Sequence, residues 1–194
     1  MGFFNWAAPV FHLFADRWDD AGIAEISGWL RPFVPPGGRL LDVGGGTGAL
    51  AKRLAVSLAA HVTVLDPTPE MISRLDGTEG VDGVLGAAEA MPFDMDAFDA
   101  LIVTDAFHHF RDQEGAVHEF VRVVRPGGGI VVLDLDPGGL VMRGIVIGEK
   151  LLGEPGTFFA PNEMCAFMAK QGVVGECTRM RGASYRYVGR VGAA

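Results

Sequence analysis

The residues with the clearest chemical pattern lie in "LLDVGGGTGAL", residues 40–50, where an apolar run ends in a cluster of glycines. Asp42 lies just before the glycines, which are Gly44, Gly45, Gly46 and Gly48. Glycine permits positive φ angles and lets the backbone approach a ligand closely. A helix that begins after such a turn has unpaired N–H groups in its first turn. We therefore expect a ligand-binding turn between a strand and a helix.

Two classes of cofactor fit these glycines. Gly44, Gly46 and Ala49 satisfy the G-x-G-x-x-A pattern of dinucleotide sites, and Gly44, Gly46 and Gly48 satisfy G-x-G-x-G. In both classes an acidic residue at the end of the next strand holds the ribose hydroxyls. Asp66, 20 positions after Gly46, is that residue. The glycine pattern alone leaves both classes open.

The position of Asp42 favours a ligand with a cationic end. A dinucleotide presents its anionic pyrophosphate to the helix N-terminus, where a neighbouring carboxylate would repel it. S-adenosylmethionine (SAM) carries an ammonium and a sulfonium group and has no phosphate. The carboxylate beside the turn therefore favours SAM, with S-adenosylhomocysteine as the product after transfer.

Strand and helix patterns alternate through the middle of the chain. Short apolar runs predict strands at residues 39–43, 61–66, 81–86, 98–105 and 129–136, and amphipathic patterns predict helices at 48–60, 68–75 and 114–124. This alternation is typical of α/β proteins with a doubly wound, mostly parallel sheet. Ligands of such sheets bind at the carboxyl ends of the strands, where the glycine turn is expected.

The two ends of the chain differ from this middle part. Residues 161–172 predict a helix, and residues 173–180 and 184–191 predict a C-terminal antiparallel hairpin. Residues 1–38 place Phe4, Phe11, Phe14 and Trp18 at helical spacing. We interpret residues 1–38 as an N-terminal helical region that packs on the edge of the sheet, acts as a lid over a substrate pocket, or does both. Residues 39–194 are then the SAM-binding part of a single domain.

Five segments together resemble one family. "LLDVGGGTG", "VTVLDPTPEM", "GAAEAMPF", "FDALIVTDAFHHF" and "VRVVRPGGGIVVLD" occur in order over about residues 39–135. This series resembles the class I SAM-dependent methyltransferases, in particular the small-molecule enzymes related to the C-methyltransferases of ubiquinone and menaquinone biosynthesis. The resemblance implies a Rossmann-like methyltransferase fold and methyl transfer from SAM to a small-molecule acceptor.

The resemblance also implies roles for individual residues. Asp42 would face the cationic amino end of SAM, and the glycines of the turn would line its methionine and ribose parts. Asp66 would accept hydrogen bonds from the ribose hydroxyls. We expect Asp66 to lie at the exposed end of a strand, so that its substitution changes the stability of the ligand-free fold little. The remaining cofactor-binding candidates are Pro67, Met71, Ala88, Glu89, Thr104 and Asp105. The family commonly has Asp, an acceptor for the adenine amino group, where this chain has Ala87; either Glu89 replaces it or this hydrogen bond is absent.

His108 and His109 are the candidate catalytic residues. They follow the fourth strand, at the edge where ligands bind, and a neutral imidazole is available near neutral pH. A base is needed only when the nucleophile carries a proton that must leave. We expect His109 to be the member of the pair that faces the pocket. The alternative is that the pair is structural.

Composition restricts the classes of partner. The formal net charge is −8 and the basic residues are scattered, so no nucleic acid is expected. Two cysteines suggest no metal site or disulfide framework, which fits a cytoplasmic protein. No uninterrupted apolar run approaches the ~18 residues of a membrane helix, so no stable membrane insertion is expected. We expect a monomer or a homodimer.

Two other functions compete with methyl transfer. The fold could carry a SAM-binding or interaction protein without catalysis, because fold does not determine function. An NAD-dependent oxidoreductase is the second rival, through the dinucleotide reading of the glycines at residues 44–49. Comparing the binding of S-adenosylhomocysteine with that of NAD distinguishes a methyltransferase from an oxidoreductase. Turnover on a panel of acceptors distinguishes a methyltransferase from a non-catalytic SAM-binding protein.

Overall fold

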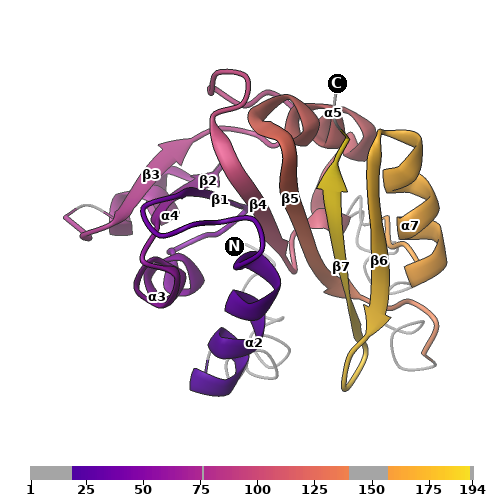
Figure 1. Ribbon diagram of the computed structural model, residues 1–194. Helices are drawn as coiled ribbons and strands as arrows, with labels where there is room; N and C mark the ends of the chain where they lie inside the picture. The colour runs from indigo at the N-terminus through magenta and orange to yellow at the C-terminus, as the bar shows by residue number, and fades with distance from the viewer. Residues whose placement is uncertain (1–18, 76, 140–156, 193–194) are drawn as a thin grey trace, which may run out of the picture.

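The computed structural model describes residues 19–75, 77–139 and 157–192. These residues form a seven-stranded sheet in the order β3-β2-β1-β4-β5-β7-β6 (Figure 1). The strands are β1 (Arg39–Val43), β2 (His61–Asp66), β3 (Val81–Leu85), β4 (Phe98–Thr104), β5 (Val124–Leu135), β6 (Val173–Arg179) and β7 (Ser184–Val191). The first five pair in parallel, and β7 is antiparallel to both β5 and β6. This confirms the expected doubly wound, mostly parallel sheet with a C-terminal antiparallel hairpin.

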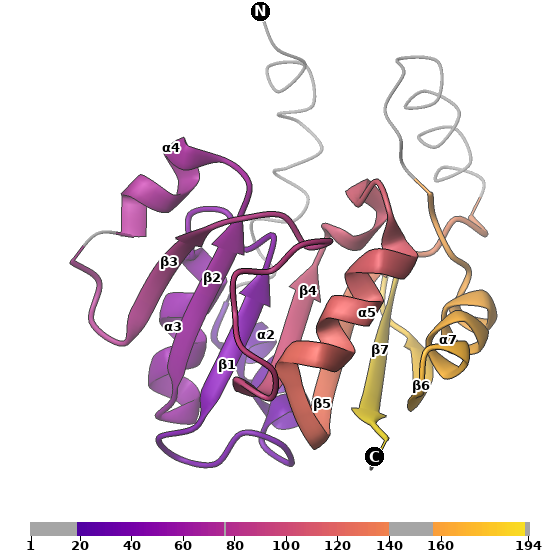
Figure 2. The same cartoon turned by 90° about the horizontal axis from the view of Figure 1, so that it is seen from above.

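Helices cover both faces of the sheet (Figure 2). The helices are α2 (Asp20–Leu30), α3 (Ala49–Leu58), α4 (Pro69–Ile72), α5 (Gln113–Val123) and α7 (Pro161–Lys170), with short 3₁₀ turns η3 (Ser73–Leu75) and η4 (Phe107–His109). α2 and α3 cover one face, and α5 and α7 cover the other. The central strands β1, β4 and β5 are therefore buried on both sides, which explains their continuous apolar runs.

Two apolar clusters make the core, one on each face. On one face, Leu30 of α2 and Leu54 of α3 pack with Ile102 and Val131 of the sheet. On the other face, the helices contribute Phe120 of α5 and Met168 of α7, and the sheet contributes Leu101, Val132 and Tyr187. Burial of apolar area on this scale is the main stabilising term of such a domain. Packing in the core sets the positions of the strands, and the strands in turn set the positions of the loops at their carboxyl ends.

One local expectation about β5 is wrong. The pattern predicted a helix at residues 114–124 that "RPGG", residues 125–128, would end, and a strand that begins only at residue 129. In the structure the helix ends at Val123 and β5 begins at Val124. The register with β4 shifts between its two pairs, Phe98 with Val124 and Ala100 with Gly129. The extra residues of β5 form a bulge, where the missing N–H of proline and the positive φ of Gly127 (+77°) are tolerated.

The N-terminal region joins the core through α2. Ile23, Ile26 and Leu30 are buried in the same cluster as α3, and the hydroxyl of Ser27 donates to the hydroxyl oxygen of Ser57 at 2.8 Å. α2 therefore lies on a face of the sheet and not at its edge. The aromatic residues expected to form the lid, at positions 4–18, lie outside the described residues. No helix among the described residues has the length and apolarity needed to cross a bilayer.

The loop from residue 86 to residue 97 is braced against α5. Arg122 donates hydrogen bonds to the carbonyl oxygens of Phe93 at 2.7 Å and Met91 at 3.0 Å. Glu119 accepts from the backbone N–H of Met91 at 2.7 Å and also pairs with Arg122. The Arg122 guanidinium is the main cause that lowers the pKa of Glu119. This brace fixes the part of the loop that leads into β4, at the amino edge of the sheet.

We expect Arg122→Ala to lower the free energy of unfolding by about 1–3 kcal/mol, because Met91 and Phe93 lose donors and Glu119 loses its partner. Urea denaturation followed by circular dichroism measures the change. Arg74→Ala is the matched control, because Arg74 is exposed, and a surface change of this kind alters stability by less than about 0.5 kcal/mol. Equal stability of both variants would show that the brace contributes nothing.

Candidate active site

The glycine turn connects β1 to α3 at the carboxyl edge of the sheet. The N–H of Gly44 donates to the carbonyl of Leu65 in β2 at 2.7 Å, and Gly48 is the N-cap of α3 without any side-chain cap. A Cβ at Gly45 would lie 2.5 Å from a carboxylate oxygen of Asp42. A Cβ at Gly46 would meet nothing within 4 Å. Gly45 is therefore required by packing, whereas Gly46 leaves open space above the turn.

Asp66 holds this turn from the end of β2. One carboxylate oxygen accepts from the N–H of Gly46 at 3.0 Å, and the other accepts from the N–H of Thr68 at 2.9 Å. Asp66 is only 7% exposed. The expectation of an exposed strand end without a structural role is therefore wrong. Each carboxylate oxygen has a second lone pair, so Asp66 retains capacity to accept from ligand hydroxyls.

Asp42 is a buried carboxylate without a donor. Its exposed fraction is 0%, and both carboxylate oxygens lack a hydrogen-bond partner among the described residues. Burial, and secondly the charge of Asp66, raise the pKa of Asp42 to about 7. An unpaired carboxylate in a low-dielectric site is costly unless a cation or a donor joins it. The residues of the turn therefore fit a ligand with a cationic end, such as the ammonium of SAM.

The other cofactor candidates surround the same edge. Met71, in α4, is half-buried and Pro67 is exposed. Ala88 is buried shortly after the end of β3. Thr104 ends β4. The ends of β2 and β3 lie on one side of the glycine turn and the end of β4 lies on the other, because β1 is between β2 and β4.

Asp105 turns the chain sharply after β4. Its φ angle is +51°, and its N–H donates to the carbonyl of Leu133 in β5 at 2.8 Å. Asp is one of the residues that tolerate the left-handed region. The turn places Ala106 against the glycine loop, because a Cβ at Gly44 would lie 2.7 Å from that of Ala106. The chain after β4 therefore packs directly on the candidate cofactor site.

Glu89 has a structural contact in addition to its expected role. Its carboxylate accepts from the N–H of Arg111 at 3.0 Å and from the N–H of Asp112 at 3.4 Å. It therefore ties the loop after β3 to the start of α5. Ala87 forms an isolated bridge with Ala90, which fixes the backbone here. A role of Glu89 toward adenine stays a prediction.

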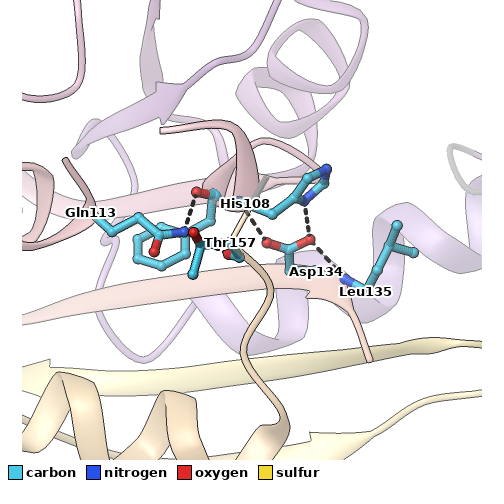
Figure 3. Close-up of polar contacts among 6 residues, drawn as sticks. His108, Gln113, Asp134, Leu135 and Thr157 are labelled. Carbon is cyan, nitrogen blue, oxygen red and sulfur yellow. Dashed lines mark hydrogen bonds and ion pairs between the residues drawn. The ribbon is translucent and has the colours of Figure 1, made fainter. Parts of the chain in front are cut away.

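His108 is clamped against Asp134, at the end of β5 (Figure 3). The Nδ1 atom of His108 lies 2.6 Å from one carboxylate oxygen, and the backbone N–H of His108 donates to the other at 3.1 Å. The N–H of Leu135 donates to the first oxygen at 2.7 Å. His108 and Asp134 are 4% and 3% exposed. Nothing in the sequence pattern distinguished Asp134 from the neighbouring Asp136, so this partner was missed.

The segment before α7 completes the clamp. The N–H of Thr157 donates to the carbonyl of His108 at 3.0 Å, and Gln113 donates to the carbonyls of Phe107 and Thr157 (Figure 3). The ring of Phe158 stacks on His108, with centroids 4.4 Å apart and planes at 17°. Main chain, side chain and ring of His108 are therefore all fixed.

His109 lies beside His108 but in a different environment. Its ring centroid is 4.0 Å from that of His108, yet the side chain is exposed. Partial burial, and then His108, lower the pKa of His109 to about 4, against an opposing effect of Asp134. His109 is neutral at physiological pH and a weaker base than a free histidine.

Comparison with known proteins agrees with this geometry. The model of a methyltransferase domain matches residues 41–132. An uncharacterized methyltransferase of Mycobacterium tuberculosis is 40% identical over 105 residues, which cover 54% of this chain and 42% of that protein. A ubiquinone/menaquinone biosynthesis C-methyltransferase of a Ruegeria species is 34% identical over 149 residues, covering 69% of this chain and 57% of that protein. The chain thus spans about half the length of these relatives.

Solved structures share the fold. A SAM-dependent methyltransferase of Thermotoga maritima aligns with a TM-score of 0.70 at 21% identity, covering 97% of this chain and 95% of that one. A methyltransferase in complex with the Trm112 activator of Haloferax volcanii aligns with a TM-score of 0.73 at 17% identity, covering 94% and 98%. At these identities the likeness establishes the fold alone.

The sequence matches and the fold lead to the same family. Its cofactor is SAM, and the turn that carries Asp42 and Asp66 lies within the matched residues. Residues 41–132 are therefore a methyltransferase domain, and the described chain has the fold of SAM-dependent methyltransferases.

Proposed function

We propose that this protein transfers the methyl group of SAM to a small-molecule acceptor. The observation that carries the proposal is the buried carboxylate of Asp42, which lacks a donor among the described residues and lies directly beneath Gly45 of the turn. A pyrophosphate would add negative charge beside it, whereas the ammonium of SAM would compensate it. This supports SAM over a dinucleotide.

Different residues at and around the turn would contact different parts of the cofactor. Asp42 binds the cationic end, Gly46 leaves room for the ligand, and Asp66 accepts from the ribose hydroxyls. Met71 and the N–H of Ala88 are assigned to the adenine, and Thr104 and Asp105 to the methionine part. When bound, SAM supplies a methyl group on a sulfonium, which is a good leaving group. The protein's own task is then to orient the acceptor and to exclude water.

The acceptor would lie on the side of β4 and β5, because their ends carry His108 and Asp134 beside the cofactor turn. The C-methyltransferase relative is named for ubiquinone and menaquinone biosynthesis, which supports a small organic acceptor here. The structural neighbour in complex with the Trm112 activator is a reason to measure the assembly state directly. We infer a monomer or a homodimer, and light scattering after size-exclusion chromatography tests it.

Calorimetric titration tests the cofactor, and mass spectrometry tests the transfer. We expect the protein to bind S-adenosylhomocysteine and not NAD. We also expect it to methylate at least one member of a small-molecule panel of phenols, amines and carboxylic acids. Binding without any transfer would leave a non-catalytic SAM-binding protein. Binding of NAD without binding of S-adenosylhomocysteine would show that SAM is not the cofactor and would contradict the proposal.

Asp42 should make the stability of the free protein depend on pH. Its pKa is about 7 in the folded chain against 3.8 ordinarily, so the folded state binds more protons between these values. Stability of the free protein therefore falls as pH rises from about 4 through 7. Asp42→Asn removes this fall. Chemical denaturation of both proteins between these pH values measures the difference, and parallel curves would show that Asp42 does not titrate there.

Titration of Asp42 should also make the affinity for the cofactor depend on pH. The ammonium of S-adenosylhomocysteine favours the ionised form of Asp42, so binding tightens as pH rises through about 7 and releases a proton. Titration calorimetry in two buffers of different ionisation enthalpy measures the released proton. The release should disappear in Asp42→Asn. An unchanged release in that variant would assign the proton to another group.

For Asp66, the two substitutions Asp66→Ala and Asp66→Asn separate binding from folding. Asp66→Ala loses the hydrogen bonds from the N–H groups of Gly46 and Thr68, so it should lose both stability and affinity. Affinity for S-adenosylhomocysteine should fall by about 1.5–3 kcal/mol, the scale for hydrogen bonds to a charged group. Asp66→Asn keeps one acceptor oxygen and should fold better while still binding weakly. Normal affinity in a folded Asp66→Ala would place the ribose elsewhere.

The open space above Gly46 gives a test with a matched control. Gly46 and Gly37 both have positive φ angles, +56° and +75°, and a Cβ at either position meets nothing within 4 Å. Gly46→Val and Gly37→Val should therefore cost similar stability through backbone strain. Only Gly46→Val should abolish binding of S-adenosylhomocysteine, measured by calorimetry. Equal affinity in the two variants would mean that the turn is not the cofactor site.

A further inference from the structure

A groove of about 590 Å³ lies between α2 and the hairpin of β6 and β7. Among the described residues that line it, none belongs to the glycine turn. Its apolar lining consists of Ile26 and Trp29 of α2, Leu133 of β5 and Met180 of the hairpin turn. Small-molecule sites are usually about 300–1,000 Å³ in volume and combine an apolar lining with a few polar groups. The groove therefore has the size of a site for a small organic molecule.

The floor of the groove is a row of side chains on three adjacent strands. Leu133 of β5 pairs with Arg186 of β7, and Arg186 pairs in turn with Thr178 of β6. Residues that lie directly opposite in an antiparallel pair project from the same face of the sheet. Ser184 precedes Arg186 by two residues, so it projects from this face as well. All four residues line the groove.

Arg186 presents a guanidinium without an acidic partner. Its guanidinium carbon lies 4.9 Å from the centroid of the Trp29 ring, and the side chain is half-buried. It forms no hydrogen bond or ion pair with the described residues, whereas the neighbouring Arg179 pairs with Asp136 at 2.8 Å. Stacking occupies the face of a guanidinium and leaves the N–H donors at its edge for an anion. Two of these donors match the two oxygens of a carboxylate.

Ser184 adds a hydroxyl to the groove. Ser184 is only 4% exposed, and its hydroxyl has no hydrogen-bond partner among the described residues. Buried polar groups are generally hydrogen-bonded, so this hydroxyl indicates a polar group on a bound molecule. A hydroxyl can donate to a carboxylate. Arg181, exposed at the hairpin turn, adds a second cation to the lining.

Two acids of α2 limit the negative charge that the groove can accept. Asp19 and Glu25 are part of the lining, and Asp19 also caps α2 by accepting from the N–H of Gly22 at 2.7 Å. Their charges would repel a dianionic phosphate more strongly than a carboxylate with one charge. The apolar walls suit a hydrocarbon or aromatic body. The lining therefore favours a monoanionic organic acid.

The floor of the groove continues to the edge where the cofactor turn lies. Leu133 pairs with Thr104 at the end of β4, and Val43, just before the turn, pairs with Val103. Adjacent strands are about 4.8 Å apart, so three strand spacings, roughly 14 Å, separate Arg186 from the start of the turn. A molecule whose carboxylate lies at Arg186 can therefore extend along the strand ends towards the cofactor, and its carboxylate is too distant to be the methylated group.

We propose, on the basis of the proposed function, that this groove binds the acceptor and that the acceptor is an organic carboxylate with an apolar body. Arg186 binds the carboxylate through two hydrogen bonds, and the hydroxyl of Ser184 donates a third. Trp29 and Leu133 contact the apolar body. The carboxylate anchors the acceptor, and the methylated atom lies at the other end of the molecule, towards β4. Arg186 thus determines which acceptors bind.

Nuclear magnetic resonance tests the groove without cofactor or turnover. Protein labelled with ¹⁵N-arginine is titrated with a series of ω-phenylalkanoates and with the neutral amides of the same acids. We expect the Nε–H resonance of Arg186 to shift in a saturable way with the acids only. Arg186→Gln should weaken the affinity for the acids, measured by saturation transfer to the ligand, by about tenfold or more. Ser184→Ala, which leaves the guanidinium in place, should weaken it by a smaller factor.

Arg190 offers a matched control on the same strand. Its guanidinium carbon lies 4.8 Å from the centroid of the Phe33 ring, but it is not among the residues that line the groove. Arg190→Gln should therefore leave the affinity for the acids unchanged. Equal binding of acids and amides, no shift of Arg186 with any acid, or wild-type affinity in Arg186→Gln would overturn the proposal. Tighter binding of phenyl phosphate than of the acids would overturn the choice of a monoanion.

Titration with S-adenosylhomocysteine separates this inference from the proposed function. Arg186→Gln should bind S-adenosylhomocysteine as the wild type does. If the wild type binds S-adenosylhomocysteine and none of the acids, the inference about the groove fails alone; if it binds the acids and not S-adenosylhomocysteine, the proposed function fails. In methyl transfer, KM should be lower for acids than for their amides, and Arg186→Gln should remove the difference. Transfer only to acceptors without a carboxylate, or a methyl ester as the product, would overturn the assigned acceptor class.

Discussion

Parallel pairing of β1 with its two neighbours is the constraint on which the rest of the structure depends. Val43 pairs with Leu65 of β2 and with Val103 of β4, so three strands end at the same level of the sheet. The ladder continues beyond the strands, because Gly44 donates to Leu65 and Asp105 donates to Leu133. The glycine turn and the turn after β4 are thereby pressed together. Every candidate site residue follows from that convergence, because each lies within a few residues of a strand end.

Three buried carboxylates at this edge differ in how their charge is compensated. Asp66 has two backbone donors, and Asp134 has two backbone donors and an imidazole. Asp42 has none among the described residues. Burial of an uncompensated carboxylate is unfavourable. Asp66 and Asp134 are compensated by the donors that they hold in place, whereas an ionised Asp42 would be stabilised by a bound cation. The same residue type is therefore compensated by donors of the fold at two positions and has no donor among the described residues at the third.

The packing of η4 shows how a loop can be as rigid as a strand. Phe107 is buried among the rings of Phe110, Phe120, Phe159 and Phe167. The next residue, His108, then has little freedom, since its backbone is fixed on both sides. Fixed orientation is what an acid or base needs to act on a bound molecule. The aromatic cluster thus helps to fix the position of the His108 ring.

The sequence by itself determined the order of strands and helices, the glycine turn and the acids at residues 42 and 66, because these depend on local periodicity and spacing. It could not determine that residues 124–128 continue β5, since a bulge depends on the partner strand. It also missed Asp134, which is 26 residues from His108 and meets it only through the pairing of β4 with β5. Burial decided the properties of Asp42, Asp66 and the two histidines, because the environment of a titratable group is made by segments distant in the chain.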